Sequence, residues 1–180
     1  MKINDGTGGG HDARVDINKH LNTRSFTNDM AHWVSKEKGQ AYIWTGDTYN
    51  YDAADTILLL RNDATDKNLI ITDIWIRGDT ETDADIHFTS GAAFTPTGTA
   101  VTGVNLNRNS TNTAEATCIR DETANTQGNV FLALRISADT EYHVDTKGMV
   151  ILGYHNSIGV DFVTDGGEAY VSIAGYYEDK

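Results

Sequence analysis

The feature that most constrains the fold of this 180-residue chain is a succession of short, strand-length apolar segments that begins near Gln40. The stretches between them are rich in Asn, Asp, Gly and Thr, which favour turns. No periodic segment beyond Gln40 is long enough for a helix of three turns, and parallel strands would need such helical crossovers. The sequence therefore predicts an all-β, antiparallel β-sandwich.

Alternation of side chains assigns a face to the clearest segments. In 83–89, apolar residues alternate with polar ones that include Asp85 and His87, so we expect a half-exposed strand with His87 toward solvent. In 68–77 both faces are largely apolar, with Ile70, Thr72, Ile74 and Ile76 on one of them, which predicts a central strand. In 130–136 the alternate residues Val130, Leu132, Leu134 and Ile136 form a predicted buried row. The remaining predicted strands are 40–45, 56–62, 100–106, 115–120, 148–155 and 168–178. About eight or nine strands is the number that a jelly roll requires.

Charge divides the chain near Gly39. The first 40 residues hold six basic and five acidic side chains, a net charge of +1, whereas the rest hold eight and 21, a net charge of -13. We therefore expect two parts, an extended N-terminal arm over 1–39 and a jelly-roll-like sandwich over 40–180. A strongly acidic surface repels phosphate and anionic headgroups, so neither nucleic acid nor a membrane is an expected partner.

The arm opens with a glycine-rich stretch, Gly6–Gly10, and continues with scattered apolar residues but no sustained period. A short helix around 28–36 with Asn28 as its N-cap is compatible with the pattern. The apolar side chains can pack on the arm's own domain, which is the favoured interpretation, or on another subunit. The candidate docking residues are Arg14, Val15, Ile17, Leu21, Phe26 and Trp33.

Motifs for catalysis or cofactor binding are absent from the sequence. No Gly-x-Ser-x-Gly elbow occurs, the six histidines have no metal-ligand spacing, and Cys118 is the single cysteine. We therefore expect a protein that is not an enzyme and that needs no cofactor or metal. The acidic run 79–85 offers oxygen ligands for calcium, but a solvated strand edge is the favoured interpretation.

Aromatic residues leave a second function open. Trp44, Tyr49 and Tyr51 lie close together in the sequence, and Tyr42 shares a strand face with Trp44. Such rings form either a platform for sugars or part of a core or subunit interface, and the core or interface is the more common outcome. A carbohydrate- or receptor-binding module is the alternative function that follows from the platform interpretation.

Several arm and strand stretches have a recognisable pattern. They are 13–18 (ARVDIN), 21–24 (LNTR), 37–42 (EKGQAY), 58–62 (LLLRN), 69–74 (LIITDI) and 167–178 (GEAYVSIAGYYE). Together they resemble a diffuse group of tailed-bacteriophage virion proteins. The resemblance covers most of the chain but not the segment 94–127, and it rests on arm and strand patterns, not on catalytic signatures. Under this resemblance, the carbohydrate- or receptor-binding alternative is a module of a phage fibre or tail.

The resemblance implies a virion structural protein on the capsid exterior, made in the host cytoplasm, of the decoration (cement) or head-fibre type. Its expected partner is the major capsid protein or another virion protein, and a homotrimer is expected by analogy with such proteins. The arm would then dock while the acidic sandwich stays soluble.

Overall fold

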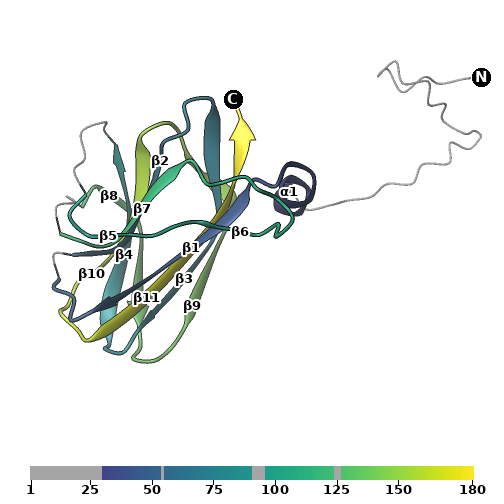
Figure 1. Ribbon diagram of the computed structural model, residues 1–180. Helices are drawn as coiled ribbons and strands as arrows, with labels where there is room; N and C mark the ends of the chain where they lie inside the picture. The colour runs from purple at the N-terminus through teal and green to yellow at the C-terminus, as the bar shows by residue number, and fades with distance from the viewer. Residues whose placement is uncertain (1–29, 54, 91–95, 124–126) are drawn as a thin grey trace, which may run out of the picture.

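Two antiparallel sheets face each other across a shared apolar core in the computed structural model (Figure 1), which describes residues 30–53, 55–90, 96–123 and 127–180. One sheet has five strands in the order β6-β1-β11-β3-β9, and the other has six in the order β5-β7-β2-β10-β4-β8. The strands are β1 Ala41–Tyr49, β2 Thr56–Asn62, β3 Lys67–Gly78, β4 Thr82–Ser90, β5 Thr99–Ala100, β6 Val104–Asn105, β7 Ala116–Glu122, β8 Asn129–Ile136, β9 Tyr142–Leu152, β10 Asn156–Phe162 and β11 Glu168–Asp179. The predicted antiparallel β-sandwich is confirmed.

The order of the strands follows from a chain that doubles back on itself. Eight strands remain when the short β5 and β6 and the inserted β7 are left out. They pair antiparallel from the ends of the chain inward: β1 with β11, β2 with β10, β3 with β9 and β4 with β8. Successive strands on each half also alternate between the two sheets. A long antiparallel double ribbon rolled in this way is a jelly roll.

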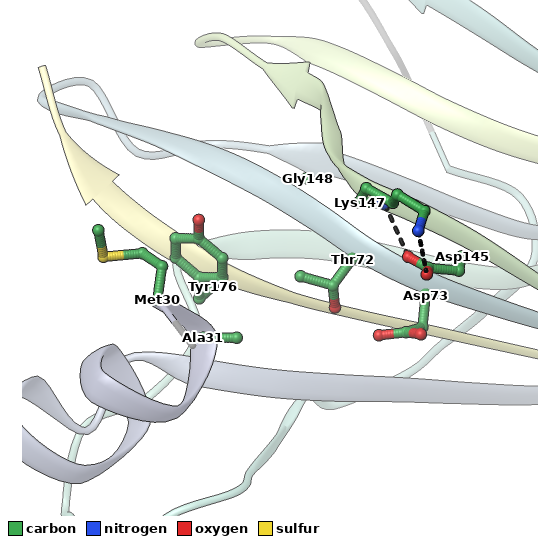
Figure 2. A pocket seen from close by; sticks show the side chains of 8 residues that line it. All are labelled: Met30, Ala31, Thr72, Asp73, Asp145, Lys147, Gly148 and Tyr176. Atoms are coloured by element: carbon green, nitrogen blue, oxygen red, sulfur yellow. Dashed lines mark hydrogen bonds and ion pairs between the residues drawn. The ribbon is translucent and has the colours of Figure 1, made fainter. Parts of the chain in front are cut away.

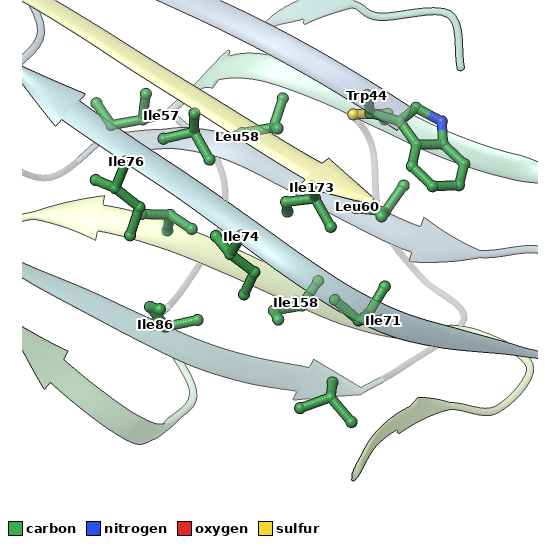
Figure 3. Close-up of a cluster of buried hydrophobic side chains, with 14 of the residues drawn as sticks. Trp44, Ile57, Leu58, Leu60, Ile71, Ile74, Ile76, Ile86, Ile158 and Ile173 are labelled. Atoms are coloured by element: carbon green, nitrogen blue, oxygen red, sulfur yellow. The ribbon is translucent and has the colours of Figure 1, made fainter. Parts of the chain in front are cut away.

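The core lies between the sheets and is built mainly from aliphatic and aromatic side chains (Figure 3). Trp44, Ile74 and Ile173 from the five-stranded sheet belong to one buried cluster with Leu60 and Ile158 from the six-stranded sheet. All five are 0% exposed. Burial of side chains of this size, at about 1.5–3 kcal/mol each, is the main stabilising contribution to a sandwich of this kind.

The strand β3 differs from strict alternation. The register with β9 shifts between Ile71 and Asp73, and the register with β11 shifts between Ala174 and Gly175. As a result Ile71 and Ile74 both point into the main core, whereas Ile70 belongs to a separate cluster. The expected single row from Ile70 to Ile76 is therefore wrong, because a bulge reverses the faces midway. The interior position of β3 is confirmed, since it pairs on both sides.

The prediction that His87 faces solvent is also wrong. His87 is 0% exposed, and its Nε2 lies 3.0 Å from Asp161 Oδ1 on the neighbouring β10. The backbone N–H of Gly128 donates to His87 Nδ1 at 3.2 Å. The ring fits because Gly159, its partner in the ladder, has no Cβ: a methyl group there would lie 2.5 Å from Nε2.

The edges of the sheets explain the other differences from the predicted strands. β8 is an edge strand, so its expected buried row tapers from Ile136, which is buried, to Val130, which is 43% exposed. β9 begins well before the predicted residue 148, and β10 occupies residues for which no strand was predicted. Between Asp145 and Val150, β9 departs from the ladder at Lys147 and Gly148, which both have positive φ.

Candidate functional site

The root of the N-terminal arm is packed onto the sandwich. A helical turn, α1 (Met30–Trp33), continues as a π-helical turn, η1 (Val34–Lys38), and leads through Gly39 into β1. Val34 is 3% exposed and forms a second buried cluster with Ala41, Ile70 and Tyr176, on the side of the five-stranded sheet that points away from the main core. We call that side the outer face.

A set of asparagine amides holds this root in place. The Nδ2 atoms of Asn105, Asn107 and Asn112 donate, each at 2.9 Å, to the backbone carbonyls of Gly39, Ser35 and Lys38 respectively. The carbonyls of Lys38 and Gly39 lie at the end of the helical segment, past its last backbone donors, whereas that of Ser35 also accepts the backbone N–H of Gly39 at 3.1 Å. We refer to the three residues as the amide clamp, and it joins the loop around β6 to the start of the sandwich.

Gly39 is required where the clamp closes. Its φ is +61°, a left-handed conformation that side chains rarely adopt, and a Cβ would lie 2.3 Å from Ser110 Oγ. Lys38 Nζ forms an ion pair with Asp179 Oδ2 at 2.8 Å, and this pair also links η1 to the end of β11. Lys38 holds the pKa of Asp179 below its ordinary value, first by hydrogen bonding and then by charge.

Beside this root the outer face contains a hollow of about 450 Å³ (Figure 2). Met30 and Tyr176 line one side of it, and Asp73, Asp145 and Lys147 line the other. Asp73 and Asp145 are directly opposite in the β3–β9 ladder, an arrangement of like charges that is unfavourable by itself. Lys147 offsets it, because its backbone N–H donates to Asp145 Oδ1 at 2.8 Å and its Nζ lies 3.7 Å from Oδ2.

The rest of the outer face combines aromatic, charged and apolar groups. His143 stacks on Trp75 with ring centroids 5.0 Å apart, and its Nε2 lies 2.7 Å from Asp73 Oδ1. Met149 and Ile151, both on the edge strand β9, are 78% and 56% exposed. The surface next to the arm root thus offers both apolar contact and negative charge.

Most of the predicted docking residues lie outside the described part of the chain. Arg14, Val15, Ile17, Leu21 and Phe26 belong to this group, as does the expected cap Asn28. Trp33 is described: it is 41% exposed on α1, and the Nζ of Lys38 lies 5.5 Å from the centre of its ring.

Sequence reasoning missed the amide clamp. It treated the segment that follows β6 as an ordinary surface loop, although four of the eight residues from 105 to 112 are asparagine. That density was the available signal, since Asn side chains commonly bond to backbone groups. The partner carbonyls lie about 70 positions earlier in the chain, and nothing in the sequence identifies them.

The acidic run 79–85 is largely paired within the protein. Arg135 contacts Glu81 Oε1 at 2.9 Å and Asp83 Oδ1 at 3.1 Å, and Asp85 accepts from Gln127 at 3.0 Å. Among the residues that the structure describes, no three His, Cys, Asp or Glu side chains come together as a group that could hold a metal ion. These contacts account for the run as a surface segment that is paired within the protein. Its strand part is not at a sheet edge, because β4 pairs with β10 on one side and with β8 on the other.

The aromatic platform does not form around Trp44. Three of these rings are at most 1% exposed and belong to the main core: Tyr42, Trp44 and Tyr51. The ring centroids of Tyr42 and Trp44 are 5.9 Å apart. Only Tyr49 of the expected group is exposed, at 55%. Because Trp44 is buried, it cannot form part of a surface platform on which sugars stack.

No helix within the described residues is long and apolar enough to cross a membrane. Comparisons of the sequence with protein-family models and with curated proteins, and of the fold with solved structures, found no match.

Proposed function

We propose that this protein is a non-enzymatic structural protein of a tailed-bacteriophage virion, which decorates or cements the outside of the capsid. Residues 1–39 attach it to the major capsid protein or another virion protein, and the sandwich projects outward as one unit of a homotrimer. The likeness of the arm and strand sequences to phage virion proteins motivates the choice of assembly.

The observation that carries the proposal is the way the arm is rooted. A flexible linker lets a domain swing freely. In this chain, burial of Val34 and the hydrogen bonds of the amide clamp fix residues 34–39 to the sandwich. A segment that attaches a domain to a surface in a defined orientation needs such a fixed origin.

Charge supports the same division of roles. The sandwich carries a net charge of -13, whereas the first 40 residues carry +1. Neighbouring acidic domains repel each other, which limits aggregation when many copies share one surface. A near-neutral arm approaches a partner without that repulsion.

Co-sedimentation with empty phage heads tests the proposal. We would compare the full chain, a truncated chain that begins at Met30, and the double variant Asn107→Ala/Asn112→Ala. The cut is placed before Met30 because Val34 packs into the sandwich. We expect saturable binding by the full chain, loss of binding on truncation, and disordered or weakened decoration by the double variant in electron microscopy.

An exposed substitution away from the root serves as the control. Val163→Ala changes a side chain that is 52% exposed, and it should bind like the full chain. Equal binding by the truncated chain would show that residues 1–29 of the arm are not needed for attachment. Absence of binding by every form would contradict the capsid assignment. Light scattering of the full chain tests the trimer separately.

A further inference from the structure

A second hollow, of about 410 Å³, lies at the arm root between the helical segment and the loop that follows β6. Figure 1 shows that loop passing next to α1. His32 and Lys36 line the hollow from α1 and η1, and Leu106, Arg108 and Asn109 line it from the loop. It is separate from the hollow of the outer face, because the two have no lining residue in common.

Arg108 differs from the other arginines that the structure describes. It is exposed and forms no ion pair with a carboxylate within the described ranges of the chain. The chain beyond residue 40 holds 21 acidic side chains against eight basic ones, so carboxylates are in excess, and the loop keeps this one guanidinium away from them. The four other described arginines all form such pairs: Arg61 with Asp63, Arg77 with Asp139, Arg120 with Asp47, and Arg135 with Glu81 and Asp83.

Hydrogen bonds on both sides of Arg108 fix its place in the loop. The preceding residue, Asn107, donates through Nδ2 to the carbonyl of Ser35 at 2.9 Å, as part of the amide clamp. The following residue, Asn109, donates its backbone N–H to Asn107 Oδ1 at 3.1 Å. The two walls of the hollow are therefore joined to each other, and a ligand that binds between them does not have to order the loop first.

The charges around the hollow favour a carboxylate. Lys36 Nζ lies 3.0 Å from Glu37 Oε1, so these two charges offset each other and the charge of Arg108 is left over. A guanidinium presents its N–H donors as a planar fork that matches a carboxylate group. His32 and Asn109 line the same hollow and add side chains that can donate hydrogen bonds.

The charge of the whole protein separates a peptide from a polyanion as the ligand. With a net charge of -12, the protein repels nucleic acid, which carries one negative charge per phosphate. A short acidic peptide has few charges and needs only the local field of Arg108. Leu106, in the lining, and Trp33, on α1 next to His32, are 51% and 41% exposed and offer apolar contact to the side chains of such a peptide.

We propose that this hollow binds an acidic peptide segment of the virion protein to which the arm attaches, with one peptide carboxylate paired to the Arg108 guanidinium. The identity of the partner rests on the function proposed above, whereas the affinity for an acidic peptide does not. The hollow lies where the arm joins the sandwich, so this contact would fix the orientation of the domain on its partner.

The test is a titration of the full chain, followed by amide NMR, with the acetylated and amidated peptide Leu-Asp-Glu-Asp. We expect saturable shifts at the amides of Leu106, Arg108 and Asn109, and binding that weakens as salt is added. The uncharged peptide Leu-Asn-Gln-Asn should not bind. Arg108→Gln should weaken binding of the acidic peptide about three- to tenfold. This variant should fold as stably as the parent, because it breaks no ion pair within the described part of the chain.

Arg77→Gln is the matched control, because it removes the same charge from an exposed arginine at the other end of β3, and it should leave peptide binding unchanged. Three results would overturn the proposal: no saturable shift with the acidic peptide, equal binding by the parent and Arg108→Gln, or tighter binding of a thymidine oligonucleotide than of the peptide. Phage heads bound by the full chain together with any of these would leave the capsid assignment intact. Peptide binding without any binding to heads would contradict that assignment and retain the peptide site.

Discussion

The imidazole of His87 and the carboxylate of Asp161 form a pair, 3.0 Å apart between Nε2 and Oδ1, on the side of the six-stranded sheet that was expected to face solvent. Because the Gly128 N–H donates to Nδ1, the ring hydrogen is on Nε2 and donates to Asp161. The pair therefore links β4, β10 and the residue that precedes β8 through one buried ring.

Substitution of Asp161 by Ala should destabilise the protein, because it leaves the buried Nε2–H of His87 without an acceptor. We expect the free energy of unfolding to fall by about 1–3 kcal/mol, as measured by urea denaturation. Asp85 lies opposite Asp161 in the ladder and accepts a hydrogen bond from the exposed Gln127 side chain, so Asp85→Ala is the control. Equal losses for the two variants would show that the His87 contact is unimportant.

Gly159 should tolerate no side chain, because an added Cβ would lie 2.5 Å from His87 Nε2 and 3.1 Å from a methyl of Thr56. We expect Gly159→Ala to lower the free energy of unfolding by about 1–3 kcal/mol through overpacking. Gly153→Ala is the control variant, because the nearest atom to an added Cβ there is 3.4 Å away. A thermal melt compares the two, and an unchanged Tm for Gly159→Ala would contradict the close packing of the ring.

The Lys38–Asp179 ion pair should make the arm root sensitive to acid. Lys38 lowers the pKa of Asp179 in the folded state, so the pair stabilises the fold fully above the ordinary carboxyl pKa of 3.8 and loses its effect as the pH falls below it. Carbon NMR titration of Lys38→Gln should find the pKa of Asp179 raised toward its ordinary value. Lys36 pairs with Glu37 instead, so Lys36→Gln should leave the pKa of Asp179 where it is.

Cys118 should be unreactive in the folded protein. It is 2% exposed within the main core, and burial raises the pKa of its thiol, which reduces the reactive thiolate fraction. A thiol-specific reagent at neutral pH should label almost nothing in native protein and one group per chain in guanidinium chloride. Rapid labelling of the native chain would mean that β7 opens readily.

Local pattern was enough to predict the sandwich and many of its strands. The predicted segment 56–62 coincides with β2, because it holds an unbroken aliphatic run from Ile57 to Leu60. The segment 168–178 lies within β11, because it is rich in β-branched and aromatic residues. The reversal of faces in β3 was not predicted, since it depends on bulges against two partner strands. Gly175 was the available signal: a Cβ there would lie 2.5 Å from the backbone oxygen of Ile70.

The arm root was less predictable than the fold. Trp33 and the short helix were visible in the sequence, but the burial of Val34 depends on Ile70 and Tyr176, which come from two distant strands. His87 was misplaced for a similar reason, because alternation cannot reveal that a strand's second face is covered. Long-range contacts of this kind leave no mark on the local pattern.

The irregular backbone of β9 has a consequence for crowded surroundings. A straight edge strand offers a row of free backbone groups on which a neighbouring chain can extend the sheet. In β9 the left-handed residues Lys147 and Gly148 break that row near its middle, and the charged Asp145 lies just before the break. Copies held close together on a shared support would therefore remain separate folded units and would not fuse, edge to edge, into a growing fibril.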